Sequence, residues 1–248
     1  MAASVTAALL IIGDEILSGR TKDKNIGYVA EYLTGIGIDL REVRIVPDEE
    51  EEIVAAVNAL RSRYTYLFTT GGIGPTHDDI TADAVAKAFG VGIRHDPRAV
   101  AMLQERYPPH ELNEARMRMA RIPDGADLID NPISKAPGFR IGNVFVMAGV
   151  PAIMQVMLDA IGPTLETGDR MISRIVEAEG LAEGHYAEGL AAIAAAEGRV
   201  SIGSYPSFSA SGFRNQIVVR GKDAAAVDAT VHAIRELLGR LRGDRNPL

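Results

Sequence analysis

The stretch TTGGIGPTHDDIT, residues 69–81, follows directly on the apolar run Tyr66-Leu67-Phe68. It places glycines at positions 71, 72 and 74, a proline at 75 and adjacent aspartates at 78 and 79. A glycine-rich turn between a strand and a helix offers backbone N–H groups to an anion, whereas neighbouring carboxylates repel an anion. The stretch therefore predicts that a buried strand ends in a ligand-binding loop, and it requires an explanation for the two carboxylates.

The same order of a buried strand followed by a helix recurs on both sides of this stretch. Strands are expected over residues 5–12, 38–46, 64–70 and 143–149. Helices are expected from residue 26, from Pro47-Asp48, over 79–89, twice within 96–121 with a break at Pro108-Pro109, and from Pro151 to about Gly162-Pro163. This alternation predicts an α/β fold with a mostly parallel sheet.

The pattern changes after the Gly162-Pro163 pair. The remaining sequence reads strand, alanine-rich helix, strand, strand and helix, which predicts a second, smaller α+β domain. Turn residues at 163–170 mark the boundary. We therefore expect one domain over residues 1–165 and another over residues 166–248.

Composition narrows the class of protein. The 248 residues carry a net charge of −7, which argues against a broad nucleic-acid surface. There are no cysteines, so disulfides and thiolate metal sites are excluded, and a cytoplasmic location is expected. The apolar N-terminal run lacks a basic flank and reaches charge at Asp14, so it is expected to be a strand and not a signal peptide, and no apolar run has the length of a membrane span.

Polar groups also follow the other predicted strands. They are Gly13-Asp14-Glu15 with nearby Ser18, then Pro47-Asp48, and then Gly149-Val150-Pro151. Ligands of open α/β sheets bind at the carboxyl ends of the strands. A divalent cation such as Mg²⁺ between a phosphate and a few carboxylates would turn their repulsion into attraction. Asp14, Asp48 and Asp79 are therefore candidate metal ligands, to which His77 could add.

Purely structural interpretations of these residues stay open. Asp78, Asp79 or Thr81 could cap the following helix, Asp48 could cap its own, and the glycines could only permit a tight turn. Three arginines at positions 116, 118 and 121 could bind phosphate, although an exposed helix face explains them more simply.

Five segments, taken in order, resemble one known family. They are IIGDEILSGRTKDKN at 11–25, VPDEEEEI at 46–53, TTGGIGPTHDDIT at 69–81, NPISKAPGF at 131–139 and MAGVP at 147–151. Together they resemble the molybdopterin-binding domain of MoaB/Mog-type proteins, of the competence/damage-inducible protein CinA and of FAD synthases. The tail resembles the small domain that follows in CinA-like and FAD-synthase-like members, and the nearest resemblance is to stand-alone CinA-like members without a C-terminal deamidase.

The resemblance implies a three-layer α/β domain that binds a pterin or nucleotide phosphate at the strand ends and assembles as a homo-oligomer. It implies that Asp48 and Asp79 are the catalytic pair and act with a divalent metal. The implied ligand-binding positions are Gly13, Asp14, Glu15, Ser18, Thr70, Gly71, Gly72, Gly74, Pro75, Thr76, Gly149 and Pro151. Ile73, Ser134-Lys135 and Ala148 depart from the residues usual in the family, and the last two of these departures concern the rim of the pocket.

Family resemblance leaves the reaction open. The tail favours a metal-dependent nucleotide pyrophosphatase acting on a substrate such as ADP-ribose or FAD. Alternatives are a molybdopterin adenylyltransferase and a carrier that binds molybdopterin without chemistry. A single-strand-binding role of the tail, using Tyr205, Phe208 and Arg214, is a further alternative.

Overall fold

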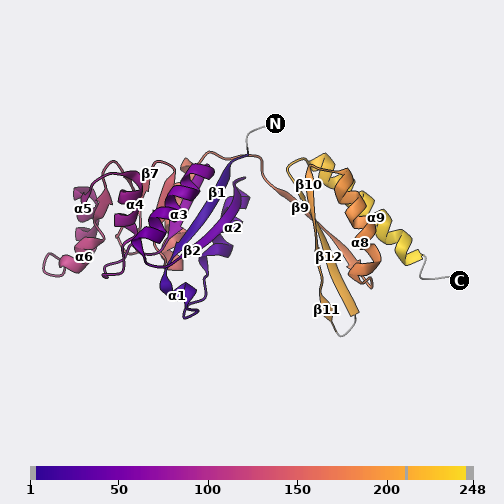
Figure 1. Cartoon of the computed structure of the whole chain (residues 1–248), viewed down its shortest axis with the longest axis horizontal. Coiled ribbons are helices and arrows are strands. Elements are labelled where there is room, and N and C mark those ends of the chain that lie inside the picture. Colours follow the sequence, from indigo (N-terminus) through magenta and orange to yellow (C-terminus); the bar gives the residue numbers. More distant parts are fainter. Residues whose placement is uncertain (1–3, 210–211, 244–248) are drawn as a thin grey trace. The chain divides into compact units, whose positions relative to one another are not determined.

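Two compact units make up the chain. A computed structural model describes residues 4–209 and 212–243, and the boundary between the units falls between Gly168 and Asp169 (Figure 1). We call them the α/β unit and the α+β unit and describe each by itself.

A six-stranded sheet forms the centre of the α/β unit, with the order β2-β1-β3-β8-β7-β6. Its strands are β1 (Thr6–Ile12), β2 (Asp39–Val46), β3 (Tyr66–Thr70), β6 (Asp127–Ile129), β7 (Gly138–Ile141) and β8 (Val144–Met147). The four strands β2, β1, β3 and β8 run parallel to their neighbours, while β7 is antiparallel to β8 and β6 to β7. The predicted mostly parallel sheet is confirmed.

Strand β1 shows why the sheet is covered on both faces. Ala8, Leu10 and Ile12 pack into one apolar core, and Leu9 and Ile11 pack into another. Successive side chains of a strand point to opposite faces, so a continuous apolar run requires a helical layer on each side.

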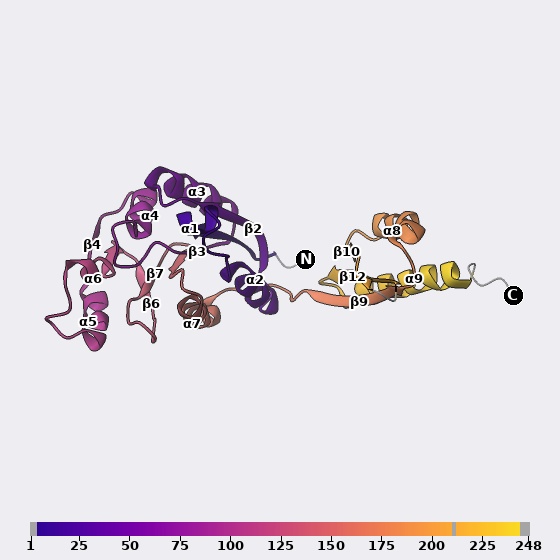
Figure 2. The same cartoon turned by 90° about the horizontal axis from the view of Figure 1, so that it is seen from below.

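Helices supply these two layers. The first core is closed by α3 (Glu50–Arg63), α4 (Thr81–Phe89) and α5 (Pro97–Arg106), and the second by α2 (Asn25–Gly35) and α7 (Pro151–Ile161). Figure 2 shows α3 and α4 on one side of the strands and α2 and α7 on the other. The expected three-layer architecture is therefore confirmed. A short α1 (Asp14–Leu17) follows β1, and a single 3₁₀ turn (Gly162–Thr164) follows α7.

The segment between α4 and β8 differs most from the sequence interpretation. The chain does break after α5, near Pro108-Pro109, but the second helix is only α6 (Glu114–Arg118). Strand β5 (Arg121–Pro123) follows at once and pairs with β4 (Ile93–His95). Strands β4, β5, β6 and β7 were not predicted, because strands of three or four residues are too short to show a period of two.

The α+β unit has an antiparallel sheet with two helices. Its elements are β9 (Ile172–Glu179), α8 (Glu183–Ala196), β10 (Val200–Tyr205), β11 (Phe208–Ser209), β12 (Gly212–Gly221) and α9 (Ala224–Gly243). The long β12 pairs with β9, β10 and β11. Val176, Tyr186, Ile217 and Ile234 share one core, which joins the sheet to both helices. The predicted order of strand, helix, strand, strand and helix is confirmed, with β11 added.

Across residues 4–209 and 212–243, the structure contains no helix that is both long enough and apolar enough to cross a membrane.

Candidate functional site

The four parallel strands end at the same level of the sheet. Ile12 is in register with Val46, and Thr70 is in register with both Ile11 and Met147. Because parallel strands present their carboxyl ends on one edge, the loops after β1, β2, β3 and β8 meet there. The loops after β3 and β8 come so close that a methyl group added at Gly149 would lie 3.2 Å from Cα of Gly71.

The first two glycines of the loop after β3 are required by close packing. Gly71 has φ +106°, and a Cβ there would lie 2.1 Å from the carbonyl oxygen of Ile12. Gly72 has φ +66°, and a Cβ there would lie 2.1 Å from Oγ1 of Thr81. That hydroxyl donates to the carbonyl oxygen of Gly71 at 3.0 Å. A side chain at Gly72 would thus press on Thr81 inside the protein and would not enter the space above the loop.

The next backbone groups of this loop lack protein partners. Among the described residues, no acceptor bonds to the N–H groups of Gly72, Ile73 and Gly74, whereas the N–H of Gly71 donates to the carbonyl oxygen of Met147 at 3.2 Å. Free N–H groups grouped in a turn are suited to an anion such as phosphate. The tight-turn interpretation and the phosphate-loop interpretation therefore apply to the same loop.

Asp79 does not cap the helix that follows it. Its Oδ2 accepts hydrogen bonds from the backbone N–H of Thr76 at 2.8 Å and from the hydroxyl of Thr76 at 2.6 Å. Helix α4 has Ile80 at its N-cap position, without a side-chain cap. The carboxylate instead lies against Gly74, where an added Cβ would be 2.6 Å from Oδ2. A side chain at position 74 would displace this carboxylate.

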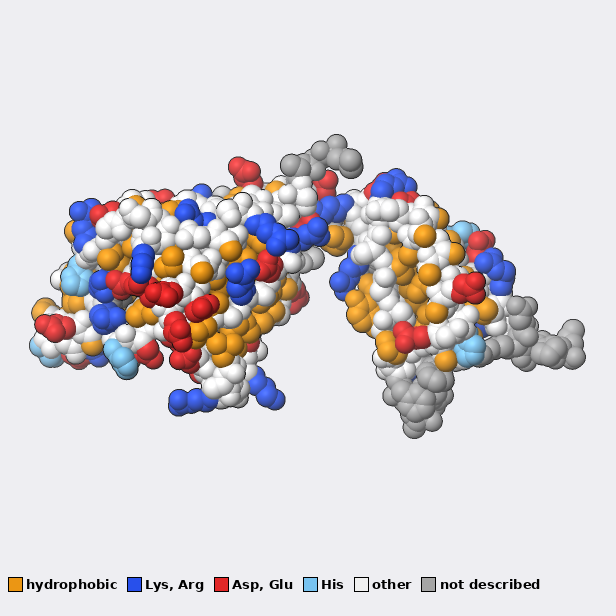
Figure 3. Space-filling model, viewed as in Figure 1, with side chains coloured by type: hydrophobic (Ala, Val, Ile, Leu, Met, Phe, Trp, Pro, Cys, Tyr) orange, Lys and Arg blue, Asp and Glu red, His pale blue; other side chains and the backbone are white. Residues whose placement is uncertain are grey.

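Asp48 connects the ends of β2 and β1. Its Oδ2 accepts a hydrogen bond from the backbone N–H of Asp14 at 3.0 Å, and helix α3 has Glu49, not Asp48, at its N-cap position. Partial burial raises the pKa of the Asp48 carboxyl, and the charges of Asp14, Glu15 and Asp78 add to that rise, against the opposing effect of the hydrogen bond from Asp14. Figure 3 shows acidic side chains gathered on this side of the α/β unit, around α1 and the start of α3.

A cleft of about 810 Å³ opens at this edge of the sheet. This volume lies within the range of small-molecule sites. The predicted site residues that line it are Gly13, Glu15, Asp48, Gly71, Gly72, Gly74, Pro75, Asp79, Gly149 and Pro151. The structure thus brings Asp48 and Asp79, the residues predicted as the catalytic pair, to one cleft with the glycine loop, which is residues 71–74 after β3.

Four predicted site residues do not line this cleft. Asp14 contributes its backbone N–H to Asp48, and Ser18 ends α1 with its own N–H bonded to the carbonyl oxygen of Asp14 at 2.8 Å. Thr76 donates its hydroxyl to Asp79. Thr70 is 1% exposed, its hydroxyl has no partner among the described residues, and the residue lines an adjoining recess of about 200 Å³.

Sequence reasoning missed part of the opposite wall. Tyr107, Met119 and Asn131 line the cleft. Asn131 is 1% exposed; its Oδ1 accepts from the N–H groups of Ile133 and Ser134 at 3.2 Å, and its Nδ2 donates to the carbonyl oxygen of Ala136 at 2.8 Å. Because β7 is antiparallel to β8, the loop before β7 opens at the same edge as the loop after β8. The segment NPISKAPGF was the available signal for this loop.

The arginines of residues 116–121 do not form an exposed helix face. Arg116 lines the cleft. Arg118 donates through Nη2 to the carbonyl oxygen of Asp79 at 3.2 Å. Arg121 holds Asp83 through two hydrogen bonds of 2.8 and 2.5 Å. The interpretation of these residues as a solvated face is therefore wrong, because each guanidinium has a separate protein contact.

The predicted metal ligands do not make a complete site by themselves. In the described part of the chain, no three His, Asp or Glu side chains converge in a way that would hold a metal ion. The side chain of His77 is 98% exposed and lies 3.9 Å from Asp78. The oxygen donors at the strand ends fit a hard cation only when a ligand phosphate supplies further oxygens, as is usual for Mg²⁺.

The α+β unit offers little to a single-stranded nucleic acid. Tyr205 is 49% exposed and borders a hollow that Arg214 also lines, but Glu177 and Glu179 line the same hollow. Two carboxylates at this place oppose a phosphate backbone. The side chain of Phe208 lies outside the described part of the structure.

Comparison with known protein families assigns both units. Residues 8–167 match the model described as probable molybdopterin binding domain. The chain belongs to this molybdopterin-binding domain family. Residues 171–242 match the middle domain of FAD synthase. The resemblance noted from the five sequence segments is therefore confirmed.

Individual relatives agree with this assignment. A CinA-like protein of Desulfosudis oleivorans is 36% identical over 77% of this chain and 49% of its own. A probable FAD synthase of Caenorhabditis briggsae is 28% identical over 94% of this chain and 49% of its own. The crystal structure of the protein CinA from Thermoplasma acidophilum superposes with a TM-score of 0.62 at 33% identity, over 65% of this chain and 99% of that one. The chain spans about half the length of the two curated relatives.

Proposed function

We propose that this molybdopterin-binding-fold protein is a divalent-metal-dependent hydrolase of nucleotide pyrophosphates such as ADP-ribose or FAD. The observation that carries the proposal is that Asp48 and Asp79 line one cleft with the N–H groups of the glycine loop, which have no acceptor among the described residues. The relative named as a probable FAD synthase supports an adenine dinucleotide as the class of ligand.

The two carboxylates distinguish an enzyme from a carrier. A carrier of an anionic cofactor gains from the N–H groups of Gly72, Ile73 and Gly74, but it loses affinity through carboxylates that repel the phosphate. Asp48 has a raised pKa because it is partly buried near Asp14, Glu15 and Asp78. Carboxylates kept at such a cost are typical of sites where they have a chemical role.

In the proposed reaction, the glycine loop binds one phosphate of the pyrophosphate. The oxygen of a water molecule forms a bond to that phosphorus, the bond from the phosphorus to the bridging oxygen breaks, and two phosphate monoesters result. Asp48 accepts the proton of the water, as a carboxylate with a raised pKa suits a general base. Asp79 accepts two hydrogen bonds from Thr76, which hold the loop in place, and its negative charge would help to hold the divalent cation. A bound divalent cation would neutralise the charge between the phosphates and the carboxylates.

The test compares hydrolysis and binding in the same proteins. ADP-ribose and FAD are supplied with Mg²⁺, Mn²⁺ or Co²⁺, and release of AMP is measured for wild type, Asp48→Asn and Asp79→Asn. Both substitutions keep the shape and an oxygen acceptor, so turnover should fall by about 100- to 10,000-fold while folding persists. Asp159→Asn, an exposed change on α7 away from the cleft, is the control and should leave turnover unchanged.

Binding separates the remaining possibilities. Calorimetric titration without metal should show that both variants bind ADP-ribose at least as tightly as wild type, because a repulsion is removed. Equal turnover in wild type and both variants would remove the two aspartates from the mechanism. Tight binding of molybdopterin with no hydrolysis of either substrate would identify a carrier, and consumption of ATP that depends on molybdopterin would identify an adenylyltransferase.

A further inference from the structure

The wall of the cleft formed by the segment from α5 to α6 differs in chemistry from the glycine loop. Within the described residues, Arg116 is the only lysine or arginine that lines the cleft, whereas Glu15, Asp48, Asp78 and Asp79 also line it. A ligand that reaches from the loop to this wall therefore passes from carboxylates to a single guanidinium.

The guanidinium of Arg116 is held in a fixed orientation. Its Cζ lies 4.2 Å from the ring centroid of Tyr107, so the group rests on the aromatic ring. Its Nη1 donates to the carbonyl oxygen of Glu111 at 2.7 Å and to Oε2 of Glu111 at 2.9 Å. The side chain of Arg116 keeps 32% exposure. A planar group fixed in this way loses little freedom when a ligand contacts it.

The charge of Arg116 is already balanced in part. Nη1 of Arg116 donates to the carboxylate of Glu111, and the same nitrogen is one of the donors that Arg116 would offer to a phosphate. This pairing weakens the attraction for a second anion, but Tyr107 covers only one of the two faces of the guanidinium, and the side chain remains partly exposed. Arginine planes stack on nucleobases as aromatic rings do, and Met119 adds an apolar neighbour in the same wall.

We infer that the Arg116–Tyr107 pair is the platform on which the purine ring of the nucleotide ligand stacks. This inference rests on the proposed function, because it assumes that the glycine loop holds the phosphates of the same ligand. It assigns the ring end of the substrate to α5 and α6 and makes Arg116 a residue that determines specificity. A purine should bind better than a pyrimidine, since its larger ring covers more of the guanidinium.

The test uses ADP, UDP and inorganic pyrophosphate as probes, all with a diphosphate and with or without a base. Affinities are measured by calorimetry on the full chain as wild type and as Arg116→Lys, which keeps the charge and removes the plane. Arg116→Lys should weaken ADP by about tenfold or more, on the scale known for stacked bases. It should leave pyrophosphate within twofold and reduce the preference of wild type for ADP over UDP.

Two further variants test the platform without changing Arg116. Tyr107→Leu removes the supporting ring and should weaken ADP but not pyrophosphate. Tyr107→Phe keeps the ring and should match wild type for all three probes. Because pyrophosphate binding reports an intact glycine loop, a variant that binds it normally is folded at the site.

Three other results of these binding measurements would contradict the inference. Equal loss of ADP and pyrophosphate affinity in Arg116→Lys would overturn the inference and make Arg116 a phosphate contact. Unchanged ADP affinity in both Arg116→Lys and Tyr107→Leu would overturn it by showing that the ring lies elsewhere. Failure of wild type to bind any of the probes would overturn the proposed function itself, and with it the assignment of the ring.

Discussion

The carboxyl group of Asp48 is a single residue whose environment opposes its own charge. Its folded-state pKa is raised, first by burial, above the ordinary value of 3.8. A carboxyl with a raised folded pKa stabilises the protein most below the ordinary value, and that stability is lost as pH rises through the raised pKa. At neutral pH the ionised Asp48 therefore costs stability in the folded state.

Asp48→Asn should consequently make the protein more stable at neutral pH. The amide keeps an oxygen to accept the N–H of Asp14 and carries no charge. We expect the free energy of unfolding at pH 7 to rise by about 0.5 kcal/mol, the scale of changes at part-exposed positions. The gain should shrink as pH falls toward about 3.5, near the usual pKa of aspartate. Urea denaturation of both proteins at the two pH values measures this.

Asp96→Asn is the control, because the pKa of Asp96 is shifted in the direction opposite to that of Asp48. A hydrogen bond from Arg98 lowers the pKa of Asp96, so its stabilising effect is present at neutral pH and is lost on acidification. This variant should be less stable than wild type at pH 7. An Asp48→Asn protein that is also less stable at pH 7 would contradict the assigned environment of Asp48.

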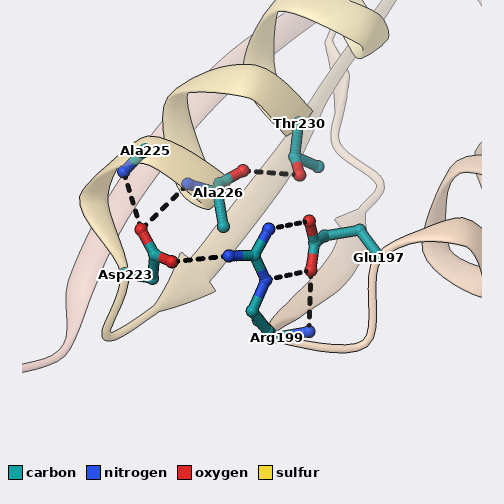
Figure 4. Close-up of polar contacts among 6 residues, drawn as sticks. All are labelled: Glu197, Arg199, Asp223, Ala225, Ala226 and Thr230. Carbon is teal, nitrogen blue, oxygen red and sulfur yellow. Dashed lines mark hydrogen bonds and ion pairs between the residues drawn. The ribbon is translucent and has the colours of Figure 1, made fainter.

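At the scale of a single element, the first turn of helix α9 is capped by the side chain of Asp223. Oδ1 of Asp223 accepts from the N–H groups of Ala225 at 3.0 Å and Ala226 at 3.2 Å, which satisfies free donors at the helix start (Figure 4). Its Oδ2 accepts from Arg199 at 2.7 Å, and Arg199 also holds Glu197, whose pKa it lowers to about 2. The cap thus ties α9 to the turn before β10.

Removing this cap should loosen the α+β unit. We expect Asp223→Ala to lower the stability of α9 by about 1 kcal/mol, the usual cost of losing an N-cap. Hydrogen exchange of the α9 amides, followed by mass spectrometry in the full chain, should show faster exchange. Glu197→Gln weakens the ion pair with Arg199 but keeps the cap, so its α9 amides should exchange as in wild type. Equal acceleration in both variants would assign the stability to the ion pair instead.

On the scale of the whole molecule, the two units have separate cores. Leu165 packs into a core of the α/β unit, the N–H of Glu166 donates to the hydroxyl of Tyr66 at 2.8 Å, and the N–H of Gly168 donates to the carbonyl oxygen of Gly37 at 3.2 Å. These contacts anchor the last residues of the α/β unit. All residues that line the cleft lie between Ile12 and Ile153.

A chain of residues 1–168 should therefore fold and bind the phosphate ligand. We expect its affinity for ADP to lie within threefold of the full chain, measured by calorimetry, with cooperative thermal unfolding as evidence of folding. A chain ending at residue 160 is the comparison, and it should be less stable because it lacks the buried side chain of Leu165 and both anchoring hydrogen bonds. Complete loss of ADP binding in a folded 1–168 protein would show that the α+β unit takes part in binding.

The sequence by itself determined the layers of the fold and the edge that carries the site. Long apolar runs such as residues 5–12, alternating with helical periods, specify buried parallel strands, because each pattern is local and repeats often enough to be read. Glycines and carboxylates placed directly after those strands must meet at one sheet edge, since parallel strands end on the same side. The glycine loop, Asp48 and Asp79 could be singled out on that ground.

Only the tertiary structure decided which partner each polar group takes. Asp48 bonds to the backbone of Asp14, across 34 positions of sequence, and Asp79 turns back to Thr76 where a helix cap was equally consistent with its position. Tyr107 and Arg116, which line the cleft, lie in the segment between β4 and β5. These two short strands pair in space and show no period in the sequence. Such contacts depend on the distances between side chains in the folded chain, and the spacing of residues along the sequence does not specify those distances.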